Sequence, residues 1–287
     1  MKNVLTLLVL LVALVSCEKP ITSADDTDTN KAVSPDDNLV VRVPTDGLSS
    51  SRLNFAVYDM DGTRVKQVNQ QLDLSRTASF QLAPHRRSAA LSCAASFQLA
   101  PGTYFLIVVA HSSNGNPTMT NPHKIQFTNA QGFTDTFLYS ENITIDDQRK
   151  ELYVTPKRIV SLCRFVITDD YPTDVAKMRF YYTGGSGAFD ATTGLGCVNS
   201  RQSLMFDITD GRKQFDLYTF LHATEGTIHL TVSALDVSDV EISRREFDVP
   251  MKQNRITSMT GSYFTGSVSI SSLTIDTDWD AEYRLTF

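Results

Sequence analysis

The sequence predicts an all-β protein of two tandem antiparallel β-sandwiches, which follow a signal peptide and an acidic tether. Two observations predict this fold class. From residue 39 onward, apolar and polar residues alternate with a period of two, and pairs of turn-forming residues separate the alternating segments at short intervals. No stretch of helical periodicity extends beyond about three turns, the ordinary helix length. Many short strands with regular turns are typical of antiparallel sandwiches.

The composition fits a folded protein and argues against several classes. The 287 residues are 41% hydrophobic and 20% charged, so neither pervasive disorder nor a protein with several membrane spans is indicated. Basic side chains number 26 against 32 acidic ones, and the net charge of −6 argues against a nucleic-acid partner. The 4 cysteines form no C-x-x-C pair, so neither a disulfide-dense scaffold nor a cysteine zinc site is indicated.

The first residues resemble a bacterial lipoprotein signal peptide. Lys2 supplies a positive charge, and residues 4–15 are apolar except for Thr6. This stretch is shorter than the roughly 20 residues of a membrane span, but it suits the apolar core of a secretion signal. Leu14-Val15-Ser16-Cys17 then matches the lipobox, whose cysteine accepts a diacylglycerol. We therefore expect residues 1–16 to be removed and Cys17 to be lipidated; a plain signal peptide that happens to contain a cysteine is the alternative.

A flexible acidic tether is predicted for residues 17–38, which begin with the lipidated cysteine. Glu18 follows that cysteine in place of the aspartate associated with inner-membrane retention, so we expect the outer membrane. Several acyl chains, palmitate among them, make such anchoring durable. An acidic run after the lipidated cysteine is also compatible with a surface-export signal, which any acidic linker would imitate. Five aspartates lie among Thr, Ser and Pro in this solvated segment: Asp25, Asp26, Asp28, Asp36 and Asp37.

Two sets of strands are predicted on either side of Thr155-Pro156. The N-terminal sandwich is assigned to residues 39–155 and the C-terminal sandwich to residues 156–287, and each set is large enough to bury a core. The alternation is clearest in residues 161–168 and 227–235, where one face is apolar. Turns are predicted at Asp61-Gly62, Pro101-Gly102, Gly184-Gly185, Asp210-Gly211 and Glu225-Gly226.

One internal repeat interrupts the first set. Residues 78–84 read Ala-Ser-Phe-Gln-Leu-Ala-Pro, and the same phrase returns at residues 95–101. Both copies do not fit one strand before the Pro101-Gly102 turn, so we expect one of them to be an extruded loop. A tandem duplication without a function of its own explains the repeat, since a single local copy is not a solenoid.

No enzyme motif and no metal site is predicted. The phrase Gly184-Gly185-Ser186-Gly187 lacks the lysine of a phosphate-binding loop and is interpreted as a turn. Residues 276–282 and 59–63 begin like calcium loops, but we interpret the first as a solvated acidic strand and the second as a hairpin turn. The sequence therefore predicts no catalytic residue, no metal and no cofactor. Five histidines form no H-x-H or H-x-x-x-H pair and are expected at the surface: His85, His111, His123, His222 and His229.

The cysteines other than Cys17 have no assigned role. Cys163 alternates with the apolar Phe165 and is most simply a small core residue. Cys197 lies in a glycine-rich loop and could pair with Cys93 or Cys163, but sequence does not give the distances that a disulfide requires.

The order of these features resembles the Bacteroidetes FimB-like fimbrial anchor subunits, the anchor branch of the fimbrillin superfamily. The resemblance implies two transthyretin-like sandwiches and a place at the base of a type V pilus, which is a cell-adhesion fimbrium. In such pili a C-terminal strand of one subunit fills a groove in its neighbour, so the expected partners are a fimbrial stalk subunit and outer-membrane lipid. The resemblance rests on the lipobox at Cys17, the acidic tether, and the sequence segments at residues 53–62, 99–110, 158–168 and 249–257.

The C-terminal residues suit a donor strand. As a hypothesis, residues 273–287 are donated to the first stalk subunit; the alternative is that they close their own sandwich. Apolar residues recur there at even spacing: Leu273, Ile275, Trp279, Tyr283, Leu285 and Phe287.

The N-terminal strand, residues 39–43, is expected to stay in place. The resemblance implies that stalk subunits lose this strand to an arginine-specific protease, and Arg52, in the loop after the strand, is the corresponding candidate site. Cleavage there would separate the lipid from the body, so we expect Arg52 to remain uncut in an anchor.

A second functional class stays open at this point. A surface lipoprotein of this kind can also bind a glycan or a host ligand through its sandwich loops, with Tyr181, Tyr182 and Phe189 near Gly184 as a candidate aromatic platform.

Overall fold

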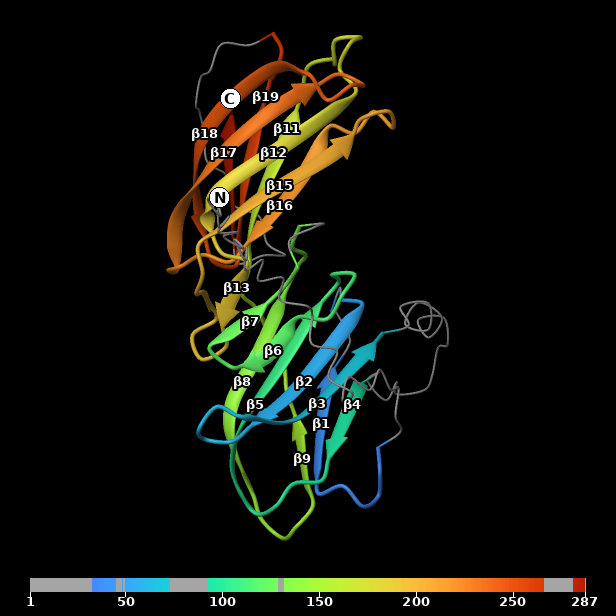
Figure 1. Ribbon diagram of the computed structural model, residues 1–287, viewed down its shortest axis with the longest axis vertical. Helices are drawn as coiled ribbons and strands as arrows, with labels where there is room; N and C mark the ends of the chain where they lie inside the picture. Colours follow the sequence, from blue (N-terminus) through green and yellow to red (C-terminus); the bar gives the residue numbers. More distant parts are fainter. Residues whose placement is uncertain are drawn as a thin grey trace, which may run out of the picture.

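The computed structural model describes residues 33–44, 48, 50–72, 92–128, 132–265 and 281–286, with the backbone alone for Ser92 and residues 281–286. Every regular element in these residues is a β-strand, which confirms the all-β prediction. Figure 1 shows two sandwiches arranged end to end along the long axis. Within the described residues, no helix is long and apolar enough to cross a membrane. The predicted signal peptide, Cys17 and most of the predicted tether lie outside the described residues.

The first sandwich packs a three-stranded sheet against a five-stranded one. Val41 of the small sheet and Phe55 and Leu106 of the large sheet belong to one buried apolar cluster. The small sheet has the order β4 (Ser92–Phe97), β1 (Leu39–Pro44), β9 (Lys150–Tyr153). The large sheet has the order β10 (Lys157–Arg158), β8 (Phe137–Ile145), β5 (Gly102–His111), β2 (Arg52–Tyr58), β3 (Arg64–Gln71).

The second sandwich packs two four-stranded sheets around an aromatic core. The rings of Phe180 and Phe215 lie 4.7 Å apart between centroids, and Phe165 meets Phe180 edge to face. Cys163 is fully buried in the same cluster, as predicted. One sheet has the order β16 (Gln214–Thr219), β11 (Ser161–Ile167), β19 (Arg255–Gly261), β20 (Ala281–Thr286). The other has the order β15 (Ser200–Asp207), β12 (Lys177–Gly185), β17 (Glu225–Leu235), β18 (Glu241–Lys252).

A third core joins the two sandwiches, and the sequence did not predict it. Phe127 and Phe133 from the first set of strands share one buried cluster with Phe189 and Phe220 from the second set. The Phe220 centroid lies 5.0 Å from that of Phe189 and 5.5 Å from that of Phe133. Two strands of each set form a small sheet over this cluster, in the order β14 (Leu195–Gly196), β13 (Ala188–Asp190), β7 (Lys124–Gln126), β6 (Thr118–Asn121).

The connection between the two sets lies at this junction. β10 pairs with β8 directly after Thr155-Pro156, so the backbone extends the first large sheet before β11 enters the second sandwich. The division of the chain into residues 39–155 and 156–287 stays a proposal.

Two of the predicted turns are wrong because their glycines lie inside strands. Gly184 and Gly185 end β12, where a Cβ on Gly184 would lie 2.4 Å from the Thr227 carbonyl oxygen. Glycine is needed at these two positions because atoms of neighbouring strands approach them closely. Glu225-Gly226 likewise begins β17.

The Asp59–Thr63 turn is confirmed. The Asp59 carboxylate accepts hydrogen bonds from the backbone N–H groups of Asp61 and Thr63, at 3.0 and 2.8 Å, and Gly62 has a φ of +81°. The second copy of the repeat supplies the last three residues of β4, whereas the first copy lies outside the described residues.

Candidate functional site

The first strand fills the centre of the small sheet. β1 runs antiparallel to β4 and parallel to β9, so both of its edges are hydrogen-bonded. Four of its side chains are fully buried, and burial of one such side chain contributes about 1.5–3 kcal/mol. Without β1, a groove would open between β4 and β9, and both of those strands would have an unpaired edge. The buried side chains are Leu39, Val40, Val41 and Val43.

Polar contacts fix the beginning and the middle of β1. The Asn38 amide donates to the Leu99 carbonyl oxygen at 2.7 Å and accepts from the Leu99 N–H at 3.0 Å. Arg42 donates to the Glu151 carboxylate of β9, and this hydrogen bond lowers the pKa of Glu151 and raises that of Arg42. The first strand is therefore held in place by its neighbours on both sides.

Arg52 lies in a strand, not in the predicted loop. It is the first residue of β2, half-buried, and pairs with Gln71 of β3 and His111 of β5. Its guanidinium donates to the Asn116 side-chain oxygen at 3.4 Å. The strand begins one residue earlier than the alternation suggested, because the backbone at Arg52 is paired on both edges.

His111 is fully buried, so its predicted surface position is wrong. Its Nδ1 accepts the Ser113 N–H at 3.1 Å, and Nε2 therefore donates to the Asn54 Oδ1 at 2.7 Å. The Asn54 amide donates in turn to Asn69 and Asn116, at 2.7 and 3.0 Å. Burial, with a smaller effect of the Arg52 charge, lowers the pKa of His111 to about 4.

The signal for this burial was present in the sequence. His111 continues the alternation of Phe105, Ile107 and Val109, whose face packs against the junction core. Its ring also meets the Phe127 ring edge to face, with centroids 5.0 Å apart.

Three other histidines lie at the surface, as predicted. His123 contacts the Asp190 carboxylate at 3.1 Å, His222 contacts the Gly196 carbonyl oxygen at 3.0 Å, and His229 contacts the Asp248 carboxylate at 2.5 Å. His85 lies outside the described residues.

Among the strands that the structure describes, the last lies at an edge of its sheet, unlike the first. β20 pairs in parallel with β19, from Arg255 opposite Ala281 to Thr260 opposite Thr286, and β19 is its one neighbour in the sheet order. Two candidate donor residues fall in β20: Tyr283 opposite Thr257 and Leu285 opposite Met259. The other four lie outside the described residues: Leu273, Ile275, Trp279 and Phe287.

A carboxylate fixes the chain just after β19. Asp169 accepts backbone N–H bonds from Tyr263, Phe264 and Thr265, at 2.8, 2.6 and 2.8 Å. Burial raises the pKa of Asp169, but these hydrogen bonds outweigh it and hold the pKa below its usual value.

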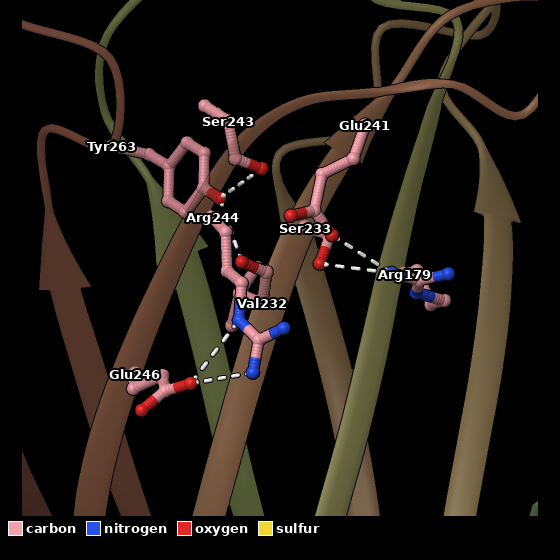
Figure 2. A network of polar contacts seen from close by, with 8 residues as sticks. All are labelled: Arg179, Val232, Ser233, Glu241, Ser243, Arg244, Glu246 and Tyr263. Carbon is pink, nitrogen blue, oxygen red and sulfur yellow. Dashed lines mark hydrogen bonds and ion pairs between the residues drawn. The ribbon is translucent and has the colours of Figure 1, made fainter.

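The side chain of Tyr263 adds a second fixed point. Its hydroxyl donates to the Val232 carbonyl oxygen at 2.8 Å and lies 3.4 Å from that of Ser243, as Figure 2 shows. Residues 263–265 are therefore anchored to β17, β18 and the loop after β11.

The start of β1 and the end of β20 lie at opposite poles of the described part of the molecule. In the first sandwich, Gly102 pairs with Ile145 at the outer pole, whereas Phe137 and Arg158 pair at the end near the junction. The chain before β1 enters at that outer pole, where Asn38 contacts Leu99. β20 ends at the other outer pole, in the upper sandwich of Figure 1.

Neither the aromatic platform nor a disulfide is present in the described residues. Tyr182 and Phe189 are buried in the cores, which leaves Tyr181 alone partly exposed. Cys93, Cys163 and Cys197 are all free thiols. The described residues also contain no group of three or more His, Cys, Asp or Glu side chains placed to hold a metal ion.

The described strands define a β protein of two sandwiches joined by a small sheet. The structure is similar to a candidate adhesin from Bacteroides ovatus, with 13% identity and a TM-score of 0.50 over 77% of this chain and 87% of that one. Residues 50–286 match the family of unknown function DUF6562, and the chain belongs to that family. No curated protein matches the sequence.

Two solved structures with lower scores were also found. The fimbrial anchor protein Mfa2 from Porphyromonas gingivalis has 13% identity and a TM-score of 0.40, over 72% of this chain and 81% of that one. A fimbrial assembly protein from Parabacteroides distasonis has 12% identity and a TM-score of 0.40, over 79% and 91%. Similarity at this level of identity concerns the fold alone.

Proposed function

We propose that this chain is a lipid-anchored subunit at the base of a type V fimbria, or a minor subunit of it, which attaches the fimbria to the outer membrane. In this proposal Cys17 carries the lipid and residues 273–287 are donated to the first stalk subunit. The observation that carries the proposal is the unequal pairing of these strands: among the described strands, β1 has two hydrogen-bonded neighbours and β20 has one.

This unequal pairing suits the first subunit of a fimbria. A subunit that retains β1 has no open groove for a donor strand, whereas an edge strand such as β20 can leave its sheet without separating two other strands. When β20 leaves, its main-chain hydrogen bonds with β19 are broken, and equivalent bonds would form in the receiving groove. Each such bond contributes a net stabilisation of about 0.5–1.5 kcal/mol. The fit of alternate side chains in the groove then decides which arrangement is favoured.

The opposite positions of the start of β1 and the end of β20 support the same role. Cys17 and residue 33 are separated by 33 − 17 = 16 residues, which reach at most about 55 Å when extended and about 20 Å as a flexible coil. The tether would join the pole at Asn38 to the membrane, and β20 would point away from it. A stalk subunit added at the far pole would extend outward from the cell.

The position of Arg52 supports retention of the N-terminal strand. A protease needs an extended, accessible segment, but the Arg52 backbone is paired with β3 and β5 on both sides. A mature N-terminus at Leu53 in cells would contradict this and would assign the chain to the stalk class.

Truncation after Ser272 in the native cell tests the donor role. We expect truncated cells to shed fimbriae into the medium, with the protein still present in the membrane. Electron microscopy and measurement of fimbrial protein in the medium check this result. Fimbriae that remain attached after the truncation would overturn strand donation. Cys17→Ala is the companion variant, and it should release the protein from the membrane fraction.

A further inference from the structure

The β17–β18 hairpin presents apolar side chains at the outer pole of the second sandwich. Val237, Val240 and Ile242 are exposed by 79%, 59% and 37%. They are three of the eight large apolar side chains that are exposed among the described residues, and they lie within six consecutive positions. We call these three side chains the apolar knob. Exposed apolar side chains gathered in one short turn make it a candidate contact surface.

The turn that carries the knob is ordered by its own hydrogen bonds. The Asp236 carboxylate accepts from the N–H groups of Ser238 and Val240, at 2.8 and 2.9 Å, and the Asp236 N–H donates to the Val240 carbonyl oxygen at 3.0 Å. Asp239 adopts a φ of +65°, which aspartate tolerates better than most residues. The two valines are therefore held in position before any partner binds, which reduces the entropy cost of binding.

A β-bulge directs the third side chain. Ala234 pairs with Ser243, but Leu235 pairs with Glu241, so Ile242 is the extra residue between the two pairs. Bulges commonly re-aim a side chain. Here the extra residue is an isoleucine whose side chain is 37% exposed, two positions after Val240.

The charges beside the knob already have partners. Asp239 pairs with Lys177 at 2.6 Å, and Glu241 pairs with Arg179 at 2.9 Å. Figure 2 shows the second pair on the outer face of the sheet. A partner that covers the knob need not bury an unpaired charge there. An apolar centre with a paired polar rim is the usual arrangement of a protein interface.

The knob and the end of β20 lie at the same pole. Leu235 pairs with Lys177, which follows the loop after β11, and Asp169 in that loop binds residues 263–265 after β19. Tyr263 reaches β17 and β18 through its hydroxyl. β20 ends beside Thr260, directly before this anchored segment. A subunit that received β20 would therefore stand against the hairpin.

We propose that the apolar knob is a second contact with the subunit that receives β20, and that it enters an apolar depression on that subunit. This inference rests on the proposed function, since it needs β20 to be donated. The donated strand then supplies the main attachment, and the knob fixes the orientation of the first stalk subunit on the pole.

A cross-linking experiment with the full-length chain in its native cell tests the contact. A photoreactive residue replaces Val237, and the matched control places it at Val65, an exposed valine of β3 in the first sandwich. We expect irradiation to join the Val237 position, but not the Val65 position, to a fimbrial stalk subunit identified by mass spectrometry. The product should disappear after truncation at Ser272.

Side-chain replacement separates the knob from the donor strand. The variant Val237→Ser/Val240→Ser should increase the fimbriae released by shear about 10-fold or more, as expected for loss of central apolar contacts. Val65→Ser should release no more than the wild type. All replaced side chains are exposed, so the purified variants should unfold at the temperature of the wild type.

Each outcome bears on one of the two proposals. If the truncation sheds fimbriae but the double variant retains them and Val237 gives no cross-link, the knob is overturned and strand donation stands. If the truncation leaves fimbriae attached, strand donation fails and the knob fails with it.

Discussion

The first and last described strands of this chain differ in how many neighbours they pair with, although each belongs to a β-sandwich. β1 lies between two strands and buries four side chains, while β20 is bonded along one edge to β19. In the first sandwich the terminal strand is part of the core structure. In the second sandwich it is an addition to a sheet that already has three other strands. Sheet position, and not distance from the terminus, distinguishes these two strands.

The largest expected effect is therefore the loss of β1. Val41→Asp places a carboxylate at the centre of β1, where the side chain is fully buried, and should destabilise the protein by at least about 4 kcal/mol because the charge has no partner. Truncation after Ser272 removes the edge strand and should cost clearly less. Urea unfolding of the chain from residue 18 onward measures both changes.

The control for this prediction is Val65→Asp, at an exposed position of β3. It should change the free energy of unfolding by less than about 1 kcal/mol. If truncation at Ser272 destabilised the protein as much as Val41→Asp, the distinction between the two terminal strands would be wrong.

A second difference between the sandwiches is the response to pH. The pKa of His111 is lowered to about 4 in the folded protein, from an ordinary value near 6.5. The unfolded chain binds more protons than the folded one between these two values, so the free energy of unfolding falls as the pH falls from about 6.5 to about 4. The difference between these two pKa values sets an upper limit of about 3 kcal/mol on this loss.

Denaturant titrations at several pH values test the prediction. His111→Gln should lower the stability at pH 7 and flatten its dependence between pH 4 and pH 6.5. His229→Gln, at an exposed strand position of the second sandwich, should change the stability at pH 7 by less than about 1 kcal/mol. Equal profiles for His111→Gln and the wild type would show that this histidine does not control the pH response.

The sequence predicted the fold class because the strands of the two sandwiches are long enough to show their period. β5 and β17 have ten and eleven residues, and alternation is plain in segments of that length. The junction sheet was missed because its strands have two to four residues, too few to show a period. Its pairings also join residues far apart in the chain, such as Phe189 with Ile125.

The positions of the two terminal strands in the sequence were predictable because their apolar residues show a pattern, but their positions in the sheets were not. Alternation alone located β1 and the even-spaced apolar residues near the C-terminus. Alternation does not reveal which strands are neighbours, so the central position of β1 and the edge position of β20 required the three-dimensional structure. The Asp169 contacts join residues 94 to 96 positions apart, and no local pattern marks them.

The smallest predicted effect concerns these Asp169 contacts. They hold residues 263–265, which lie between β19 and β20 in the sequence. Asp169→Ala removes a charged acceptor from three backbone N–H groups and should destabilise the protein by about 1–3 kcal/mol. Its neighbour Asp170 lies fully in solvent, 3.6 Å from Lys213, so Asp170→Ala is the matched control and should have an effect below about 1 kcal/mol.

Amide hydrogen exchange gives the more specific readout. In Asp169→Ala the amides of Tyr263, Phe264 and Thr265 should exchange faster, because each loses its acceptor, while amides of β1 keep their protection. Faster exchange that spread into β11 and β19 would show that the carboxylate stabilises the sandwich as a whole. Exchange confined to residues 263–265 and β20 would show that this carboxylate sets the boundary between the fixed core and the exchangeable strand.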